Sequence, residues 1–147
     1  MKTILANSSG EVYMTAEYDS ENLWVRNYWQ GQQTYVGMVA GGNACLALLQ
    51  QHQCHYLLSD KRQAVGLWDE TMEWITTSWT PRAVAAGMTH LAQVVSVESL
   101  PAHSSEIMRH RLEEKCYIRT FSGMAEAQAW LRAAQQANAN SPASITH

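Results

Sequence analysis

The stretch from His55 to Val95, HYLLSDKRQAVGLWDETMEWITTSWTPRAVAAGMTHLAQVV, decides the fold. It begins with a short apolar run at 55–59, which predicts a buried strand. The charged triplet Asp60-Lys61-Arg62 then leaves that strand as a loop. A tryptophan-rich helix is expected at 69–79, because apolar side chains recur there at offsets of three and four residues.

The second half of the stretch returns the chain to the sheet. Thr80-Pro81 predicts a helix start, with Thr80 as N-cap and proline in the first turn. Gly87 predicts the matching helix end, and an apolar run at 88–95 predicts another strand. Strand, helix and strand in this order indicate an α/β crossover between parallel strands.

Upstream, the chain predicts a hairpin and a third strand. Segments 2–6 and 11–18 flank Asn7-Ser8-Ser9-Gly10, which is turn chemistry, so the two strands should pair antiparallel. A third strand is expected at 22–29, with Gly31 ending it. A helix follows at 33–51, whose buried face should hold Tyr35, Val39, Gly42, Leu46 and Leu49. The adjacent Gly41-Gly42 predicts either a close contact between helix and sheet or a kink in the helix, and the less favoured alternative is a close approach of the backbone to a ligand.

Downstream, a more polar helix is expected at 99–114, a last strand at 116–121 and a final helix after Ser122. The fold class is therefore α/β: a single-domain sandwich at residues 1–137, with a mixed five- or six-stranded sheet and about four helices. Residues 138–147 lose all patterning and predict a disordered C-terminal tail.

Composition limits the partners. The 147 residues carry a net charge of −3 with 46% hydrophobic and 16% charged residues, which is typical of a packed globular domain. No basic stripe is present, so we expect no nucleic-acid partner. No apolar run reaches about 18 residues, which predicts no membrane span and a cytoplasmic protein. The odd number of cysteines, Cys45, Cys54 and Cys116, predicts free thiols.

Charged side chains concentrate around one loop. Asp60, Lys61, Arg62, Asp69 and Glu70 could perform acid–base chemistry or hold a metal ion. The favoured alternative is structural, with Asp69 and Glu70 capping a helix and Asp60 pairing with Arg62. We expect no catalytic residue, no cofactor and no metal.

His103, Glu106 and His110 share one face of the helix expected at 99–114. They lack the His-Glu-x-x-His pattern of a zinc site, so this face is also expected to hold no metal.

The tryptophans raise two alternatives. Trp74 lies about 120° from the main apolar face of its helix, so it either packs on a neighbouring element or is exposed at an interface. A second hypothesis is an apolar pocket, lined by four of the six tryptophans: Trp24, Trp29, Trp68 and Trp79.

Three segments carry a family resemblance. LLSDKR at 57–62, GLWDETMEWITTSWTPRAVAAG at 66–87 and FSGMAEAQAWL at 121–131 resemble STAS-like proteins. That group is named for sulphate transporters and anti-sigma-factor antagonists. The chain looks like its small stand-alone bacterial members, which are similar to sporulation anti-sigma-factor antagonists. The resemblance implies a STAS-like sandwich that works as a non-enzymatic binding module.

The resemblance also implies a regulatory position. In some STAS domains a Ser or Thr at the start of the helix after a central strand is phosphorylated. The matching positions here are Asp69-Glu70-Thr71, where the usual serine is missing and Thr71 is the remaining candidate. A related resemblance, to the CRAL-TRIO lipid-binding fold, implies a pocket for an apolar ligand.

We therefore expect a non-catalytic binding or regulatory module that acts through protein contacts, with an unidentified partner or as a homodimer. The alternatives are a carrier of a small apolar ligand and, more distantly, an enzyme that uses the Asp60–Arg62 loop. The residues expected to bind the partner or ligand are Asp60, Lys61, Arg62, Trp68, Asp69, Glu70, Thr71 and Trp74.

Overall fold

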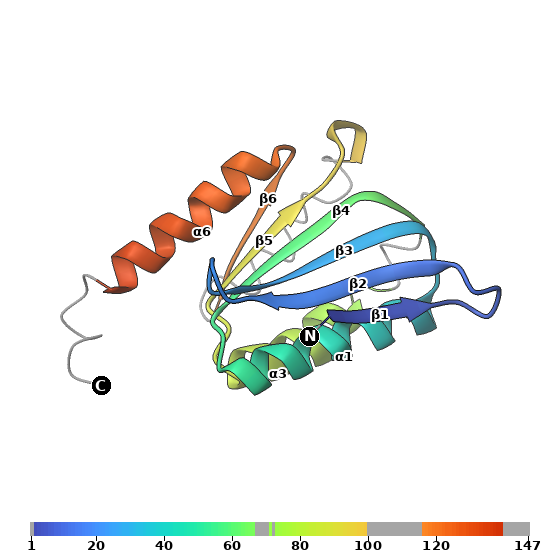
Figure 1. Cartoon of the computed structure of the whole chain (residues 1–147), viewed down its shortest axis with the longest axis horizontal. Helices are drawn as coiled ribbons and strands as arrows, with labels where there is room; N and C mark the ends of the chain where they lie inside the picture. Colours follow the sequence, from blue (N-terminus) through green and yellow to red (C-terminus); the bar gives the residue numbers. More distant parts are fainter. Residues whose placement is uncertain (1, 67–70, 72, 100–115, 140–147) are drawn as a thin grey trace.

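A computed structural model describes residues 2–66, 71, 73–99 and 116–139. Its centre is a six-stranded mixed sheet in which the strands lie side by side in sequence order (Figure 1). The strands are β1 Lys2–Ala6, β2 Val12–Asp19, β3 Trp24–Gln33, β4 Tyr56–Gly66, β5 His90–Val94 and β6 Tyr117–Phe121. β1, β2 and β3 pair antiparallel, whereas β3 to β6 are parallel neighbours. The predicted hairpin and mixed sheet are confirmed.

Helices cover both faces of this sheet. α1 Tyr35–His52 and α3 Thr80–Ala85 lie on one face, and α6 Met124–Ala139 lies on the other (Figure 1). A π-helical turn, η1 Ile75–Trp79, precedes α3, and a short 3₁₀ turn, η2 Val97–Ser99, follows β5. The described residues therefore hold three α-helices rather than about four. The helix expected at 99–114 falls almost entirely outside them.

At the C-terminus, α6 extends to Ala139, so the residues at 138 and 139, expected in the tail, belong to this helix. The rest of the expected tail, residues 140–147, lies outside the described residues.

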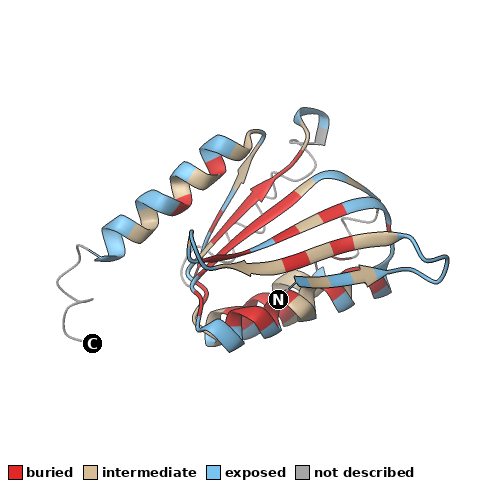
Figure 2. Cartoon of the chain, in the orientation of Figure 1, coloured by how far each residue is buried: buried red, intermediate tan, exposed pale blue. Residues whose placement is uncertain are grey.

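Strand alternation sorts the core into two layers. Along β4, Leu57 packs beneath α1 and Leu58 packs beneath α6. The same alternation puts Val25 and Trp24 of β3 on opposite faces. Figure 2 shows the buried residues in the middle of the sheet and along the inner side of α1. The α1 layer is the larger one, and it contains the candidate site.

β3 and β4 run further than their sequences predict. They pair in parallel from Val25 opposite Leu57 to Gln33 opposite Gly66, with an irregularity between Tyr28 and Gln30. The expected strand ends at Gly31 and before Asp60 are therefore wrong. Most side chains of this extension are polar, so they lack the apolar signal of a strand. The extension forms because the backbones of β3 and β4 pair with each other. Asp60, Lys61 and Arg62 consequently lie within β4 and not in a loop.

Thr80 is not the N-cap of a helix. Its φ and ψ of −63° and −42° are helical, its backbone N–H donates to the Ile75 carbonyl, and the chain passes directly from η1 into α3. Pro81 has no N–H to continue the normal ladder, and the π turn just before it accommodates that break. The predicted stop at Gly87 is confirmed, because Gly87 has φ +110° and Met88 N–H donates to Ala83 across the turn at 2.9 Å.

The buried face of α1 matches the expected one only in its second half, where Leu46 and Leu49 are buried as predicted. Tyr35 is exposed and Val39 is half-buried, whereas Met38, Gly41 and Cys45 are buried. α1 is apolar almost all round, so periodicity alone does not fix its rotation. The close approach of α1 to Trp29 at Gly41 fixes the rotation of the helix, because a Cβ at Gly41 would lie 2.3 Å from Cη2 of Trp29.

We expect Gly41→Ala to lower the free energy of unfolding by about 1–3 kcal/mol, because overpacking outweighs the gain in helix propensity. Gly42→Ala is the comparison variant: its Cβ would also be tight, at 3.1 Å from Trp74, but it requires a much smaller shift than a Cβ at Gly41 does. Urea denaturation of both variants measures the difference. Equal midpoints for the two variants would contradict the close contact between α1 and Trp29.

Candidate functional site

The structure separates the expected site residues into two groups. Lys61, Thr71 and Trp74 line one cavity in the α1 layer. Asp60 and Arg62 belong to the opposite face of β4, where Asp60 lines a polar groove that also contains Met124 of α6. Trp68, Asp69 and Glu70 lie outside the described residues. The prediction of one charged surface at 60–62 is therefore wrong. Side chains along β4 alternate between the two faces of the sheet, so Lys61 points away from Asp60 and Arg62.

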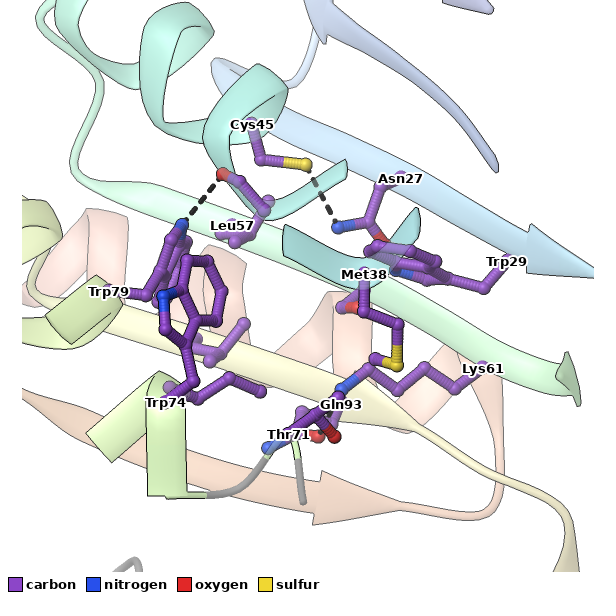
Figure 3. Close-up of a pocket in the computed structure, with 14 residues that line it drawn as sticks. Asn27, Trp29, Met38, Cys45, Leu57, Lys61, Thr71, Trp74, Trp79 and Gln93 are labelled. Atoms are coloured by element: carbon purple, nitrogen blue, oxygen red, sulfur yellow. Dashed lines mark hydrogen bonds between the residues drawn. The ribbon is translucent and has the colours of Figure 1, made fainter. Parts of the chain in front are cut away.

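The cavity lies between the sheet and its helical cover. Its volume is about 50 Å³, and it is partly enclosed. Its floor comes from β3, β4 and β5, and its roof comes from α1, residue 71 and the segment 74–79 (Figure 3). The described residues lining it are Asn27, Trp29, Met38, Gly42, Cys45, Leu57, Ser59, Lys61, Thr71, Trp74, Ile75, Trp79, Leu91 and Gln93. A single water needs a cavity volume of roughly 10–15 Å³. The cavity therefore has room for roughly three to five waters or for a ligand of similar size.

Indole rings form much of the wall. Trp74 and Trp79 both pack against Gly42 of α1, where an added Cβ would lie 3.1 Å and 3.3 Å from them. Trp79 also donates its indole N–H to the Gly42 carbonyl at 2.7 Å (Figure 3). Trp74 is half-buried, with the Arg82 guanidinium 5.8 Å from its ring centre. Of the two alternatives for Trp74, intramolecular packing is the one observed.

Lys61 introduces a cation into this apolar setting. Its side chain is half-buried, and its Nζ donates to Oε1 of the buried Gln93 at 3.2 Å (Figure 3). Burial lowers the pKa of the Lys61 amine from 10.5 to about 8. Near neutral pH the amine is thus mostly protonated, with a substantial neutral fraction.

Two further polar groups in the cavity wall have unused hydrogen-bonding capacity. Asn27 is 6% exposed, and its Oδ1 has no hydrogen-bond partner. Its Nδ2 donates to Sγ of Cys45 at 3.2 Å, and burial raises the pKa of that thiol to about 11. Trp29 is 4% exposed, and its Nε1 also has no partner. Such groups are rare in native proteins and call for a water or a ligand.

Thr71 is fully buried, at 0% exposure. Phosphorylation would need this hydroxyl to leave the cavity wall first. The regulatory position that the STAS resemblance implies is therefore inaccessible in this conformation at Thr71.

The opposite face of β4 carries a local ion pair. Oδ2 of Asp60 accepts from Nη2 of Arg62 at 2.8 Å, and Oδ1 accepts from the Arg62 backbone N–H and Nε. The expected pairing of these two side chains is confirmed. Asp60 and Arg62 therefore largely neutralise each other.

The sequence identified only part of the site. Of the four tryptophans assigned to a pocket, Trp29 and Trp79 line the cavity, but Trp24 packs under α6 on the other face and Trp68 lies outside the described residues. Asn27 and Gln93 were missed. Their signal was present: each is a polar residue at an inward position of an otherwise apolar strand segment.

No three His, Cys, Asp or Glu side chains among the described residues come together as metal ligands. His103, Glu106 and His110 are not described. All three cysteines are buried and free, as predicted. None of the helices in the described ranges is both long and apolar enough to cross a membrane.

Comparison with known proteins leaves the family open. No protein-family model matches the sequence, and a search of curated proteins finds no similar sequence. The resemblance to STAS-like proteins stays a prediction.

Proposed function

We propose that this protein binds a small carbonyl or carboxyl compound in the cavity between the sheet and α1. The observation that carries the proposal is the Lys61 amine in a tryptophan-lined cavity whose wall also holds two unpartnered polar atoms, Asn27 Oδ1 and Trp29 Nε1. A mostly apolar cavity with a few polar groups in its wall and one shifted pKa is the usual form of a small-ligand site.

Each polar group has a role in this proposal. The Lys61 ammonium donates to the carbonyl or carboxylate oxygen of the ligand. Asn27 Oδ1 accepts from a ligand hydroxyl or from a water held with the ligand. The indoles of Trp74 and Trp79 cover the apolar part of the ligand. The proposal therefore follows the ligand-carrier alternative, whereas a function through protein contacts stays a prediction.

Size limits both the ligand and its affinity. A cavity of about 50 Å³ suits roughly three to five heavy atoms. Small ligands gain at most about 1.5 kcal/mol per heavy atom, so four atoms give about −6 kcal/mol and a Kd of tens of micromolar at best. We expect short-chain acids to bind with micromolar to millimolar Kd, and long-chain acids to bind more weakly unless the cavity widens.

Thermal unfolding with acetate, propionate, butyrate and octanoate tests the proposal. At 100 times Kd, a two- or three-carbon acid should stabilise the fold by about 2.7 kcal/mol and raise Tm by about 5–10 °C. Lys61→Met should remove this shift, whereas Lys2→Met, which makes the same change on exposed β1, should retain it. The proposal fails if none of the short acids shifts Tm, or if both variants respond like the wild type.

A further inference from the structure

The cavity holds a nucleophile as well as a binding group. Lys61 Nζ reaches into it from β4 and donates to Oε1 of Gln93 on β5 (Figure 3). We propose that Lys61 captures small aldehydes or ketones covalently, as an imine formed inside this cavity. The inference rests on the proposed function, since it uses the same cavity and the same amine.

The reaction needs no reagent beyond the protein and the carbonyl compound. The neutral Lys61 amine attacks the carbonyl carbon, a C–N bond forms, and the carbonyl oxygen takes up a proton to give a carbinolamine. The C–O bond then breaks, water leaves, and a protonated C=N bond remains. Overall one ammonium and one carbonyl compound give one iminium ion and one water, and the step is reversible.

The surroundings favour the amine as the reacting group. Burial lowers the pKa of Lys61 to about 8, so far more neutral amine is present near neutral pH than at an ordinary lysine, whose pKa is about 10.4. The other titratable side chain in the described wall is Cys45. Its pKa of about 11 keeps it a protonated thiol and a poor nucleophile. The partly enclosed, mostly apolar wall limits the access of bulk water, which opposes hydrolysis of the imine.

Reductive trapping of the full-length wild-type protein tests this inference. Acetaldehyde is added at pH 7.5 with cyanoborohydride, which reduces an imine to a stable secondary amine, and peptide mass spectrometry locates the modification. The chain has three lysines, Lys2, Lys61 and Lys115, so the other two serve as internal references. The α-amino group is a third reference, because its ordinary pKa of about 8 matches that of Lys61.

We expect Lys61 to be modified at least about tenfold faster than Lys2, and the preference to disappear in urea. Naphthaldehyde, which is too large for the cavity, should modify the α-amino group but not Lys61. Modification of Lys61 no faster than Lys2, or an equal preference for naphthaldehyde, would overturn the inference. If short acids raise Tm but Lys61 is not trapped, only the covalent step is wrong; if neither result appears, the proposed function is wrong as well.

Discussion

Replacement of Trp79 by alanine is expected to lower the free energy of unfolding by about 3–5 kcal/mol, the usual cost of removing a buried aromatic side chain. Trp79 is 5% exposed, packs against Gly42 and donates to the Gly42 carbonyl at 2.7 Å. It therefore joins the segment 75–79 to α1 by both packing and a hydrogen bond. Loss of the ring should open the roof of the cavity and separate these elements.

Trp79→Phe is the matched control. It retains an aromatic ring but removes the indole donor, so it should cost about 1–2 kcal/mol less than the alanine variant does. Urea denaturation at pH 7 measures both variants. A loss below about 1 kcal/mol for Trp79→Ala would show that the segment 75–79 does not dock on α1 as described.

The second large effect is a gain in stability from Lys61→Met. Burial lowers the pKa of Lys61 from 10.5 to about 8, so the folded state disfavours the ammonium that the unfolded chain carries freely. At 1.36 kcal/mol per pKa unit, and allowing for screening by solvent at a half-buried group, the cost is about 2–3 kcal/mol. Methionine has a similar length without the charge, so the variant should be more stable at pH 7. The net gain should be smaller than this cost, because the buried Gln93 Oε1 loses the Lys61 amine as its donor.

This gain should depend on pH in a defined direction. Below pH 8 Lys61 is protonated in both states, so the full cost of burying the charge is present. Between pH 8 and 10.5 the folded protein releases the proton first, and the stability of the wild type rises towards that of Lys61→Met. The buried thiols, whose pKa values are raised, act in the opposite sense at higher pH, so the difference between the two proteins is the quantity to compare.

Free energies of unfolding of wild type, Lys61→Met and the surface control Lys2→Met at pH 7, 8 and 9 check this expectation. Lys61→Met should be the most stable at pH 7, with a gap that narrows by pH 9. A constant gap, or a destabilised Lys61→Met, would contradict a desolvated amine in the cavity.

The sequence predicted the elements better than their ends and rotations. The helix end at Gly87 was predicted because glycine is the usual residue where a helix stops at positive φ. The ends of β3 and β4 were not predicted. The polar extension of these strands is stabilised by pairing between segments that are distant in the sequence. The rotation of α1 depends on the contact between Gly41 and Trp29, which lie on different elements.

The candidate site was also predicted only in part. Lys61, Thr71 and Trp74 were among the predicted binding residues, and all three line the cavity. They were grouped with Asp60 and Arg62 because the triplet at 60–62 was interpreted as a loop. Once β4 extends through these residues, alternation sends Lys61 to one face and its two neighbours to the other. Gln93 contacts Lys61 only through the parallel pairing of β4 with β5.

The most direct test of the central claim is a pH titration of the lysine side chains by NMR, with lysine labelled in ¹³C and ¹⁵N. Three lysines give few signals, and Lys61→Met assigns the one of interest. We expect a Lys61 amine that titrates near pH 8, and a pKa of Lys61 that rises when propionate binds and stabilises the ammonium. A Lys61 amine that titrates near its ordinary pKa of about 10.4 and does not respond to propionate would contradict this expectation.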